Sequence, residues 1–281
     1  MRIYKTKKFL QKRLKLLKSN KKIIGFVPTM GALHQGHLSL VKAAQKQCDI
    51  VIVSIFVNPT QFDRKEDLDN YPSTIEQDTR LLKQVGCDMV FIPNIKEMYA
   101  QNITAKDYDF DGLDKVMEGA HRQGHFDGVG TIVKKLFDIV QPDYAFFGEK
   151  DFQQLQIIKK LVEIHRLPLK IIGVPIYRED DGLAMSSRNV RLTPENRQAA
   201  PFIYQTLQGA QQLFKTQKPK EVINWVYEQF AQHPLLKLEY FSIADESNLL
   251  PLETKEKGHK YRGFIAVFAG NIRLIDNIAL N

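Results

Sequence analysis

The chain has few cysteines and no long apolar run. Its 281 residues include two cysteines, Cys48 and Cys87, and no CxxC pair. This spacing argues against a disulfide framework and a cysteine zinc site, so we expect a reducing, cytoplasmic compartment. The longest mainly apolar runs, 50–57 and 264–269, have the length of strands. Because a membrane-spanning helix needs roughly 18 or more consecutive apolar residues, no membrane span is expected.

Acidic residues are missing from the first 22 positions, which hold ten of the 40 Lys and Arg residues. The rest of the chain carries 30 basic and 32 acidic residues, so the net charge of +8 comes from this one segment. Phe9, Leu10, Leu14 and Leu17 fall at helical spacing, which favours a helix with a buried apolar stripe and a solvated basic face. A nucleic-acid or membrane-surface patch is the less favoured alternative. The segment matches neither a secretory signal nor a transit peptide.

The alternation of apolar runs with helical patterns predicts the fold class. Hydrophobic residues make up 43% and charged residues 26%, which excludes collagen-like, low-complexity and disordered chains. Short β-branched runs predict buried strands at 23–27, 50–56, 89–92, 144–147 and 169–174, with helices near 37–47, 73–85, 130–140 and 152–165. This order is typical of a doubly wound parallel α/β sheet, whose ligands bind beyond the carboxyl ends of the strands.

The pattern changes after residue 176. A polar stretch, YREDDGLAMSSRN, leads to Thr193-Pro194-Glu195, a strong helix start. We expect one long helix to about residue 215, a second at 219–232, and strands at 238–243, 263–269 and 272–276 with a hairpin turn at Gly270-Asn271. The chain is therefore predicted to form an α/β domain at 1–176 and a smaller α+β domain at 177–281.

Two histidines follow the first buried strand. His34 and His37 flank Gly36 where a helix is expected to begin. A helix N-terminus attracts anions, imidazole donates hydrogen bonds to phosphate, and glycine lets a ligand approach the backbone. Nucleotide phosphate binding is thus favoured over incidental loop histidines. A zinc site would also enlist His121 and His125, but no supporting motif is present.

Polar side chains also follow the later strands. Asn58 and Gln61 in NPTQF are amides suited to hydroxyls and carboxylates. Lys150 in GEKDFQQ suits phosphate, and Asp151 suits either a helix cap or magnesium. The stretch Met185 to Arg188 supplies two hydroxyls and a guanidinium that could close over phosphates. The ends of separate strands therefore deliver amides, cations and histidines to one predicted crevice.

Several of these segments carry a family resemblance. PTMGALHQGHLSL, VSIFVNPTQF, HRQGHFDGVGT, FGEKDFQQL and DGLAMSSRN, taken in order across 23–192, resemble the pantoate–beta-alanine ligase family. The stretch 34–37 resembles the HIGH signature of the nucleotidylyltransferase and class I aminoacyl-tRNA synthetase superfamily, and 185–188 lies where that superfamily has its KMSKS loop. The resemblance implies a Rossmann-like sheet of the nucleotidylyltransferase type.

The resemblance also implies an activity. ATP and (R)-pantoate would give pantoyl adenylate and pyrophosphate, after which beta-alanine would give pantothenate and AMP. Mg²⁺, a cytoplasmic homodimer and no nucleic-acid partner are implied with it. Two alternatives stay open. One is a nucleotidylyltransferase that acts on a small phosphorylated acceptor, and the other is an RNA-binding role for the basic first segment.

The site residues are carried over position by position. The catalytic candidates are His34, His37, Lys150 and Arg188. The ATP-binding candidates are Met30, Gly31, Ala32, Leu33, His34, Gln35, Gly36, His37, Gly148, Glu149, Lys150, Asp151, Tyr177, Met185, Ser186, Ser187 and Arg188. Gln61, Gln154 and Asn58 are the candidates for pantoate and beta-alanine, and Asp78 and Asp151 for the metal. The family's YPRT is replaced by Tyr71-Pro72-Ser73-Thr74, so position 73 lacks a cation and receives no role.

Overall fold

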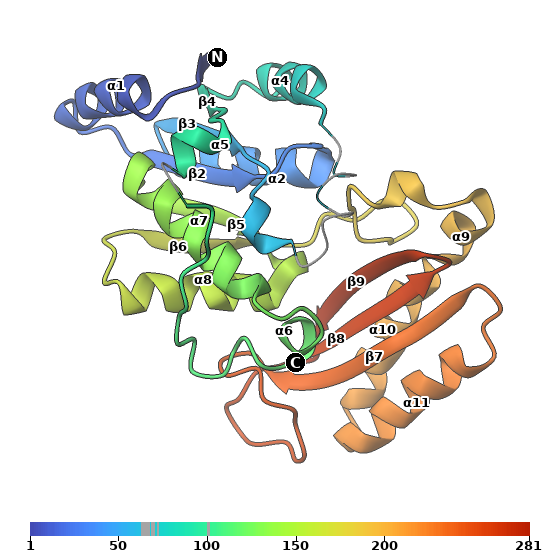
Figure 1. Cartoon of the computed structure of the whole chain (residues 1–281). Coiled ribbons are helices and arrows are strands. Elements are labelled where there is room, and N and C mark those ends of the chain that lie inside the picture. The colour runs from blue at the N-terminus through green and yellow to red at the C-terminus, as the bar shows by residue number, and fades with distance from the viewer. Residues whose placement is uncertain (63–67, 69–70, 72, 100–101) are drawn as a thin grey trace. The chain divides into compact units, whose positions relative to one another are not determined.

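The computed structural model describes residues 1–62, 68, 71, 73–99 and 102–281. Pro72, in the segment that departs from the family pattern, lies outside these residues. The chain divides into two units, each with its own sheet (Figure 1). Unit 1 comprises Met1–Asp114, Glu118–Glu149 and Gln154–Pro175, and unit 2 comprises Lys115–Met117, Lys150–Gln153 and Ile176–Asn281. The domain boundary near 176 stays a prediction.

The sheet of unit 1 has six parallel strands in the order β1-β4-β3-β2-β5-β6. They are β1 (Arg2–Tyr4), β2 (Ile24–Thr29), β3 (Ile50–Ile55), β4 (Met89–Phe91), β5 (Tyr144–Gly148) and β6 (Lys170–Val174). The prediction of five buried parallel strands is confirmed to within about two residues at each end. The sequence pattern missed β1, because this three-residue edge strand lies in the Lys-rich segment and lacks an apolar run.

In the part of the chain that the structure describes, seven helices lie between or beside these strands. They are α1 (Lys7–Ser19), α2 (Gln35–Gln45), α4 (Ile75–Gln84), α5 (Ile95–Met98), α6 (Met117–His121), α7 (His125–Val140) and α8 (Phe152–Ile164). Helices α1, α2, α4, α7 and α8 were predicted, whereas the short α5 and α6 were not. Helix α1 buries Leu10, Leu14 and Leu17, as the spacing predicted, and packs against α7. Helix α7 begins five residues before the predicted start, since Gly128 and Gly130 lie inside it rather than in a loop.

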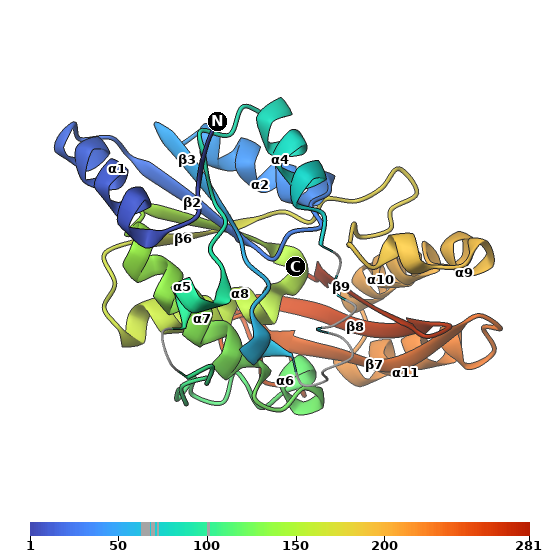
Figure 2. The same ribbon diagram turned by 45° about the horizontal axis from the view of Figure 1, so that its top comes forward.

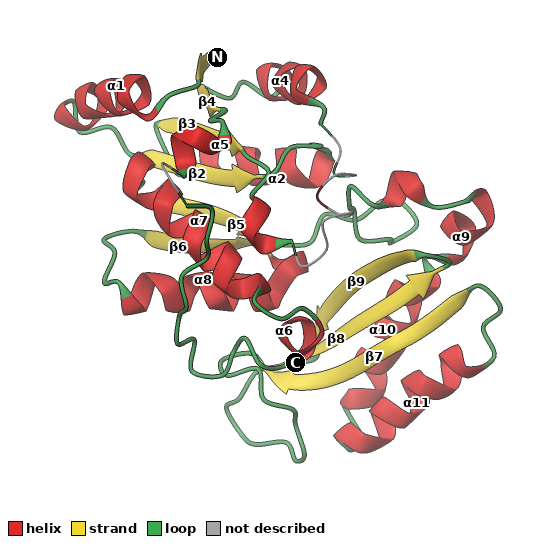
Figure 3. Cartoon of the chain, viewed as in Figure 1, coloured by secondary structure: helices red, strands yellow, loops and turns green. Residues whose placement is uncertain are grey.

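Both faces of the six-stranded sheet are covered, as Figure 3 shows with helices in red around the yellow strands. Successive residues of a strand point to opposite faces. Phe26 meets Phe137 of α7 at 6.3 Å between ring centroids, whereas Val27 joins a buried cluster with Leu38 and Val41 of α2. The predicted doubly wound architecture is therefore confirmed.

The strand order reverses beside β2. The strands that follow it directly in sequence, β3 and β4, lie on one side, and the later β5 and β6 lie on the other. Helix α2 packs on β2 and β5 together. In a doubly wound sheet, ligands bind at the carboxyl ends of the two strands where the order reverses. The fold thus directs the turn after β2 and the residues after β5 to the expected binding position.

Unit 2 is built on an antiparallel sheet in the order β7-β8-β9, the predicted α+β arrangement. Its strands are β7 (Leu236–Asp245), β8 (Tyr261–Ala269) and β9 (Ile272–Ala279), and its helices are α9 (Pro194–Ala199), α10 (Phe202–Phe214) and α11 (Pro219–Ala231). Helix α10 packs on β8 and β9, and α11 packs on β7, as can be followed in Figure 2. Gly270 turns the β8–β9 hairpin with φ +59°.

The single long helix expected up to residue 215 is wrong. The chain forms α9 and α10 instead, separated at Ala200-Pro201. Ala200 and Pro201 both keep helical dihedrals, but Pro201 has no N–H to donate to a preceding carbonyl, so the helical hydrogen bonds are interrupted there. The predicted start is confirmed, because the Thr193 side chain accepts a hydrogen bond from the backbone N–H of Asn196. No helix in the part of the chain that the structure describes is long and apolar enough to cross a membrane.

Candidate active site

The turn after β2 is held by one carboxylate from α4. Gly31 and Ala32 have φ +87° and +50°, a conformation that costs a non-glycine residue about 1–2 kcal/mol. Asp78 Oδ2 accepts the Ala32 N–H at 3.0 Å, and Asp78 Oδ1 accepts the Leu33 N–H at 2.8 Å. A hydrogen bond to a charged group contributes about 1.5–3 kcal/mol, so these two bonds offset the strain at Ala32. Asp78 therefore fixes the backbone that leads into α2.

This arrangement does not fit the metal role expected of Asp78. Its side chain is only 1% exposed, and the Thr74 hydroxyl also donates to Oδ1 at 3.2 Å. A Cβ on Gly31 would lie 3.0 Å from Asp78 Oδ2, so the surroundings are tightly packed. Within the described ranges, no group of three or more His, Cys, Asp or Glu side chains is placed to hold a metal ion. Asp151, the other candidate ligand, is exposed at the end of the 3₁₀ turn Glu149–Asp151.

The two histidines lie at the start of α2. His34 is the N-cap residue, and its backbone N–H donates to His37 Nδ1 at 3.3 Å. The ring centroids of His34 and His37 are 4.1 Å apart. Because His37 Nδ1 accepts a hydrogen bond, the neutral ring carries its proton on Nε2. The turn thus combines an imidazole N–H donor with the N-terminal end of a helix, which favours anions.

Gln61 lies in the 3₁₀ turn Pro59–Gln61 after β3, and its amide is held from both ends. Gln61 Nε2 donates to Met30 Sδ at 2.8 Å, while Gln61 Oε1 accepts from Asn58 Nδ2 at 3.3 Å. The Tyr99 hydroxyl donates to Asn58 Oδ1 at 2.6 Å. Burial raises the pKa of Tyr99, so the phenol stays a donor and fixes which end of the Asn58 amide is nitrogen.

Asn58, a predicted substrate ligand, is enclosed by the protein. It is 1% exposed, and Asn58 Nδ2 also donates to the carbonyl of Gly128 at 3.1 Å. The amide of Asn58 is thus engaged by the protein on both ends, and one of its partners is Gln61. Gln154, on the first turn of α8, is half-buried.

Sequence reasoning missed the part of α7 that supports Gln61. A Cβ on Gly128 would lie 2.2 Å from the carbonyl oxygen of Thr60, so only glycine allows α7 to approach this turn so closely. His125, which is 7% exposed, places Nδ1 2.9 Å from the Gln61 carbonyl oxygen. The usable signal was Gly128 and Gly130 in GHFDGVGT, since glycine inside a helix marks a close approach.

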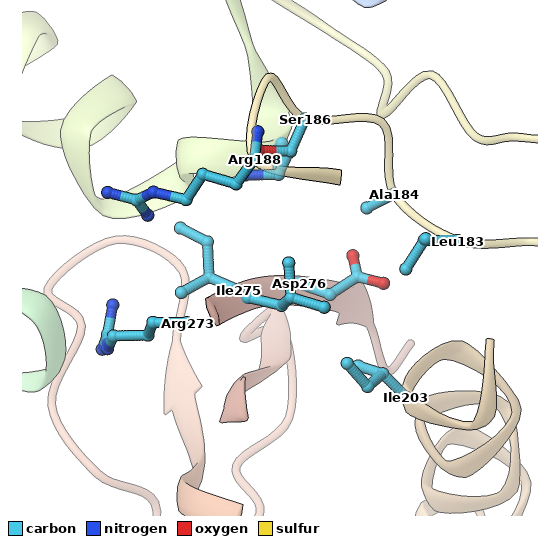
Figure 4. A pocket seen from close by; sticks show the side chains of 10 residues that line it. Leu183, Ala184, Ser186, Arg188, Ile203, Arg273, Ile275 and Asp276 are labelled. Carbon is cyan, nitrogen blue, oxygen red and sulfur yellow. The ribbon is translucent and has the colours of Figure 1, made fainter. Parts of the chain in front are cut away.

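In unit 2 the structure brings three predicted residues to one pocket. Lys150, Ser186 and Arg188 line it together with Arg273 and Asp276. In Figure 4, Ser186 and Arg188 lie on one side of the pocket, and Arg273 and Asp276 lie on the other. The guanidinium groups of Arg188 and Arg273 point toward the same end. Lys150, Arg188 and the Ser186 hydroxyl are suited to phosphate oxygens, whereas Arg273 is already paired with Glu239 at 2.6 Å.

Other predicted ATP-binding residues lie at 177–188 in unit 2 and at the end of β5 in unit 1. The Met185 N–H donates to the Tyr177 carbonyl at 3.0 Å, and the Arg188 N–H donates to Ser186 Oγ at 3.2 Å. Tyr177 is 42% exposed, and neither it nor Ser187 is among the residues that line the pocket. In unit 1, Gly148 and Glu149 lie half-buried at the carboxyl end of β5, beside the reversal of strand order.

Comparison with known proteins identifies the family. The family model described as pantoate-beta-alanine ligase matches residues 2–279. The chain belongs to this family. Among curated relatives, the pantothenate synthetase of Christiangramia forsetii is 55% identical over 282 residues, covering 100% of both chains. The pantothenate synthetase of Bacteroides thetaiotaomicron is 48% identical over 278 residues, covering 99% of this chain and 98% of the relative.

Solved structures agree with this assignment. Pantothenate synthetase from Thermus thermophilus matches with a TM-score of 0.92 and 40% identity, covering 100% of this chain and 99% of the other. A pantoate-beta-alanine ligase from Francisella tularensis, in complex with beta-gamma ATP and beta-alanine, matches with a TM-score of 0.80 and 36% identity, covering 100% and 98%. The predicted fold and family resemblance are therefore confirmed.

Proposed function

We propose that this protein joins (R)-pantoate to beta-alanine in an ATP-dependent reaction that passes through pantoyl adenylate. The observation that carries the proposal is the family match across residues 2–279. The fold supports it, because the turn with His34 and His37 follows β2 at the reversal of strand order, where nucleotides bind in doubly wound sheets.

In the proposed first step, a pantoate carboxylate oxygen attacks the α-phosphorus of ATP. A P–O bond forms there, the bond to the bridging oxygen breaks, and pyrophosphate leaves with the electron pair. Such a transfer needs alignment and charge neutralisation rather than a covalent nucleophile. We assign His37 Nε2–H, Lys150 and Arg188 to the charge that develops on the phosphates, with His34 beside His37.

The rest of the proposed ATP contacts come from backbone and hydroxyl groups. The strained turn that Asp78 holds brings backbone close to a nucleotide, and the N-terminus of α2 favours phosphate. In unit 1 we assign Met30, Gly31, Ala32, Leu33, Gln35, Gly36, Gly148 and Glu149 to ATP, and in unit 2 Asp151, Tyr177, Met185, Ser186 and Ser187.

Gln61 and Gln154 are the proposed ligands for pantoate. An amide both donates and accepts, so it suits the hydroxyls and the carboxylate of this acid without neutralising the nucleophile. The Asn58–Gln61 contact keeps Gln61 in one orientation before substrate arrives, which lowers the cost of ordering it. Asn58 is proposed to act only through Gln61.

Magnesium enters the proposal as part of the substrate. Mg²⁺ usually binds through substrate phosphates with one or two carboxylates and several waters. The enclosed Asp78 does not fit that role, whereas the exposed Asp151 does. When bound, the ion would neutralise phosphate charge.

In the proposed second step, the amine of beta-alanine attacks the acyl carbon of the adenylate. A C–N bond forms, the C–O bond to phosphate breaks, and AMP leaves while the amine loses a proton. The adenylate is sensitive to water, so closure of the 185–188 segment over it would have a chemical purpose.

We further propose a cytoplasmic homodimer. Burial raises the pKa of Cys48 to about 11 and of Cys87 to about 12, as expected for unreactive thiols.

Pyrophosphate release tests the proposal. The purified protein is given ATP, Mg²⁺ and pantoate, with and without beta-alanine, and pantothenate and AMP are quantified. Sustained turnover only with all components, giving both products in equal amounts, is expected. Turnover with a phosphorylated acceptor and no amine would favour the nucleotidylyltransferase alternative. Elution as a monomer in light-scattering chromatography would contradict the homodimer.

A further inference from the structure

The wall of the unit 2 pocket contains a buried acid whose charge is neutralised. Asp276 is 5% exposed and is the one carboxylate among the described residues that line the pocket. Its two oxygens accept from Arg178 Nη1 at 2.7 Å and Nη2 at 3.0 Å. Figure 4 shows the Asp276 carboxylate pointing away from the guanidinium groups of Arg188 and Arg273. An acid in a pocket for phosphate would repel its ligand, and the Arg178 pairing removes that repulsion.

Arg178 also fixes the chain that leads to the Ser186–Arg188 segment. Its guanidinium lies 3.6 Å over the Tyr204 ring, and Nη1 donates to the Gly182 carbonyl at 3.0 Å. Burial raises the pKa of Asp276, while the Arg178 charge, the Asn277 N–H and Lys150 oppose that shift. The pair thus joins β9 to residues 178–182 in one arrangement.

The next residue of β9 reaches the backbone of Lys150. Asn277 is 2% exposed, and its Nδ2 donates to the carbonyl oxygen of Lys150 at 2.9 Å. Arg262 Nη1 donates to Asn277 Oδ1 at 2.7 Å, so the Asn277 nitrogen must face Lys150. Arg262 is itself held by Glu246 at 2.8 Å and stacks 4.0 Å over the ring of Phe152. Every member of this chain of contacts belongs to unit 2.

We infer that Asn277 is a positioning residue for Lys150: by holding the Lys150 carbonyl, it fixes the backbone from which the ammonium group reaches a phosphate of ATP. The inference rests on the proposed function, which assigns Lys150 to ATP. Asn277 does not line the pocket, so it would act on ATP binding only through Lys150.

Two variants of Asn277 test this role by calorimetric titration with ATP and Mg²⁺. Asn277→Ala removes the donor to Lys150 and is expected to weaken ATP binding about tenfold, the size of coupling found within one hydrogen-bond network. Asn277→Asp keeps the shape and the Arg262 contact but turns an oxygen toward the Lys150 carbonyl. Because the Arg262 contact is kept, we expect this variant to fold. Because the donor to Lys150 is lost, we expect its affinity for ATP to be weakened as well.

Asn281→Ala is the matched control. Asn281 also bridges two backbone groups of unit 2, accepting from the Tyr261 N–H and donating to the His259 carbonyl, both at 2.7 Å. These two partners lie outside the Lys150 segment, so the loss of Asn281 should lower the thermal midpoint and leave ATP affinity unchanged. An equal loss of ATP affinity in Asn281→Ala and Asn277→Ala would overturn the inference.

A double-mutant cycle separates positioning from a general structural effect. In a Lys150→Ala background, Asn277→Ala should cause no further loss of ATP affinity, because the group it positions is gone. Additive losses, or an unchanged affinity in Lys150→Ala alone, would overturn the inference. The wild-type assay for pantothenate decides the proposed function separately, since ATP affinity is measured without pantoate or beta-alanine.

Discussion

The backbone N–H of Leu33 donates to Asp78 Oδ1 at 2.8 Å, although 45 positions separate the two residues in the chain. This bond and its neighbour at Ala32 connect α4 to the turn after β2. The turn sets where α2 begins and hence where both histidines lie. A carboxylate far from the HxGH stretch therefore determines the shape of the proposed nucleotide site.

Replacement of Asp78 is expected to destabilise the protein. Asp78→Ala leaves the buried Leu33 N–H and the partly buried Ala32 N–H without their acceptor, so the free energy of unfolding should fall by about 2–4 kcal/mol. Asp78→Asn keeps one accepting oxygen and should lose less. Urea unfolding measures both, with the exposed Glu76→Ala on the same helix as control. An Asp78→Asn protein of wild-type stability that needs a much higher Mg²⁺ concentration for activity would restore the metal role.

The sequence predicted those parts of the fold that are determined by residues close together in the chain. The β-branched run at 50–56 and the leucine spacing in α1 are local, so periodicity was enough to find them. The break at Pro201 also had a local signal, which the helical pattern on both sides outweighed. Strand β1 was missed because this short edge strand needs little apolar surface.

The candidate site was predicted as a set of residue types rather than as a geometry. His34, His37 and Lys150 could be proposed because their chemistry and their place after a strand are visible in the chain. The groups that hold them were not, because they come from remote positions: Asn277 lies 127 residues from Lys150. Asn58 shows a second effect of packing that the sequence does not reveal. Its amide looked available, but burial against Tyr99 and Gly128 commits it to the protein.

His37 gives a prediction that separates catalysis from helix capping. His37→Ala should lower pyrophosphate release by ~10²-fold, as removal of a preorganised donor does elsewhere. It should also lose the cap that His37 Nδ1 provides to the His34 N–H. His37→Gln restores an acceptor at this position of the helix, so its thermal midpoint should recover while its rate stays low. Equal rates in His37→Gln and the wild type would contradict the catalytic role.

Gly128 predicts a link between helix packing and pantoate binding. A Cβ there would meet the Thr60 carbonyl at 2.2 Å, so Gly128→Ala must push α7 away from the turn that carries Gln61. We expect a loss of about 1–3 kcal/mol in unfolding free energy and a raised KM for pantoate. Gly130→Ala on the same helix is the control, since its Cβ would meet only the edges of Tyr108 and Phe110 at 3.1 Å. Equal effects of the two substitutions on the pantoate KM would count against this link.

His259 predicts a pH-dependent contribution to the stability of unit 2. The hydrogen bond from His259 Nδ1 to Asp245 Oδ2, at 2.7 Å, raises the pKa of His259 above its ordinary value of 6.5. The folded protein therefore holds this proton more tightly than the unfolded chain does. The resulting stability is complete below the unfolded pKa and is lost as the pH rises through the folded pKa.

His259→Gln should accordingly lower the thermal midpoint more at pH 5.5 than at pH 8.5. His233 is an internal control of opposite sign, because burial lowers its pKa and its neutral form is the one that the fold favours. The stability that His233 contributes is present above the unfolded pKa and is lost as the pH falls. His233→Gln should therefore cost more at pH 8.5 than at pH 5.5. Thermal melts of both variants at the two pH values measure this, and the same pH trend in both would mean that the Asp245 contact does not set the effect.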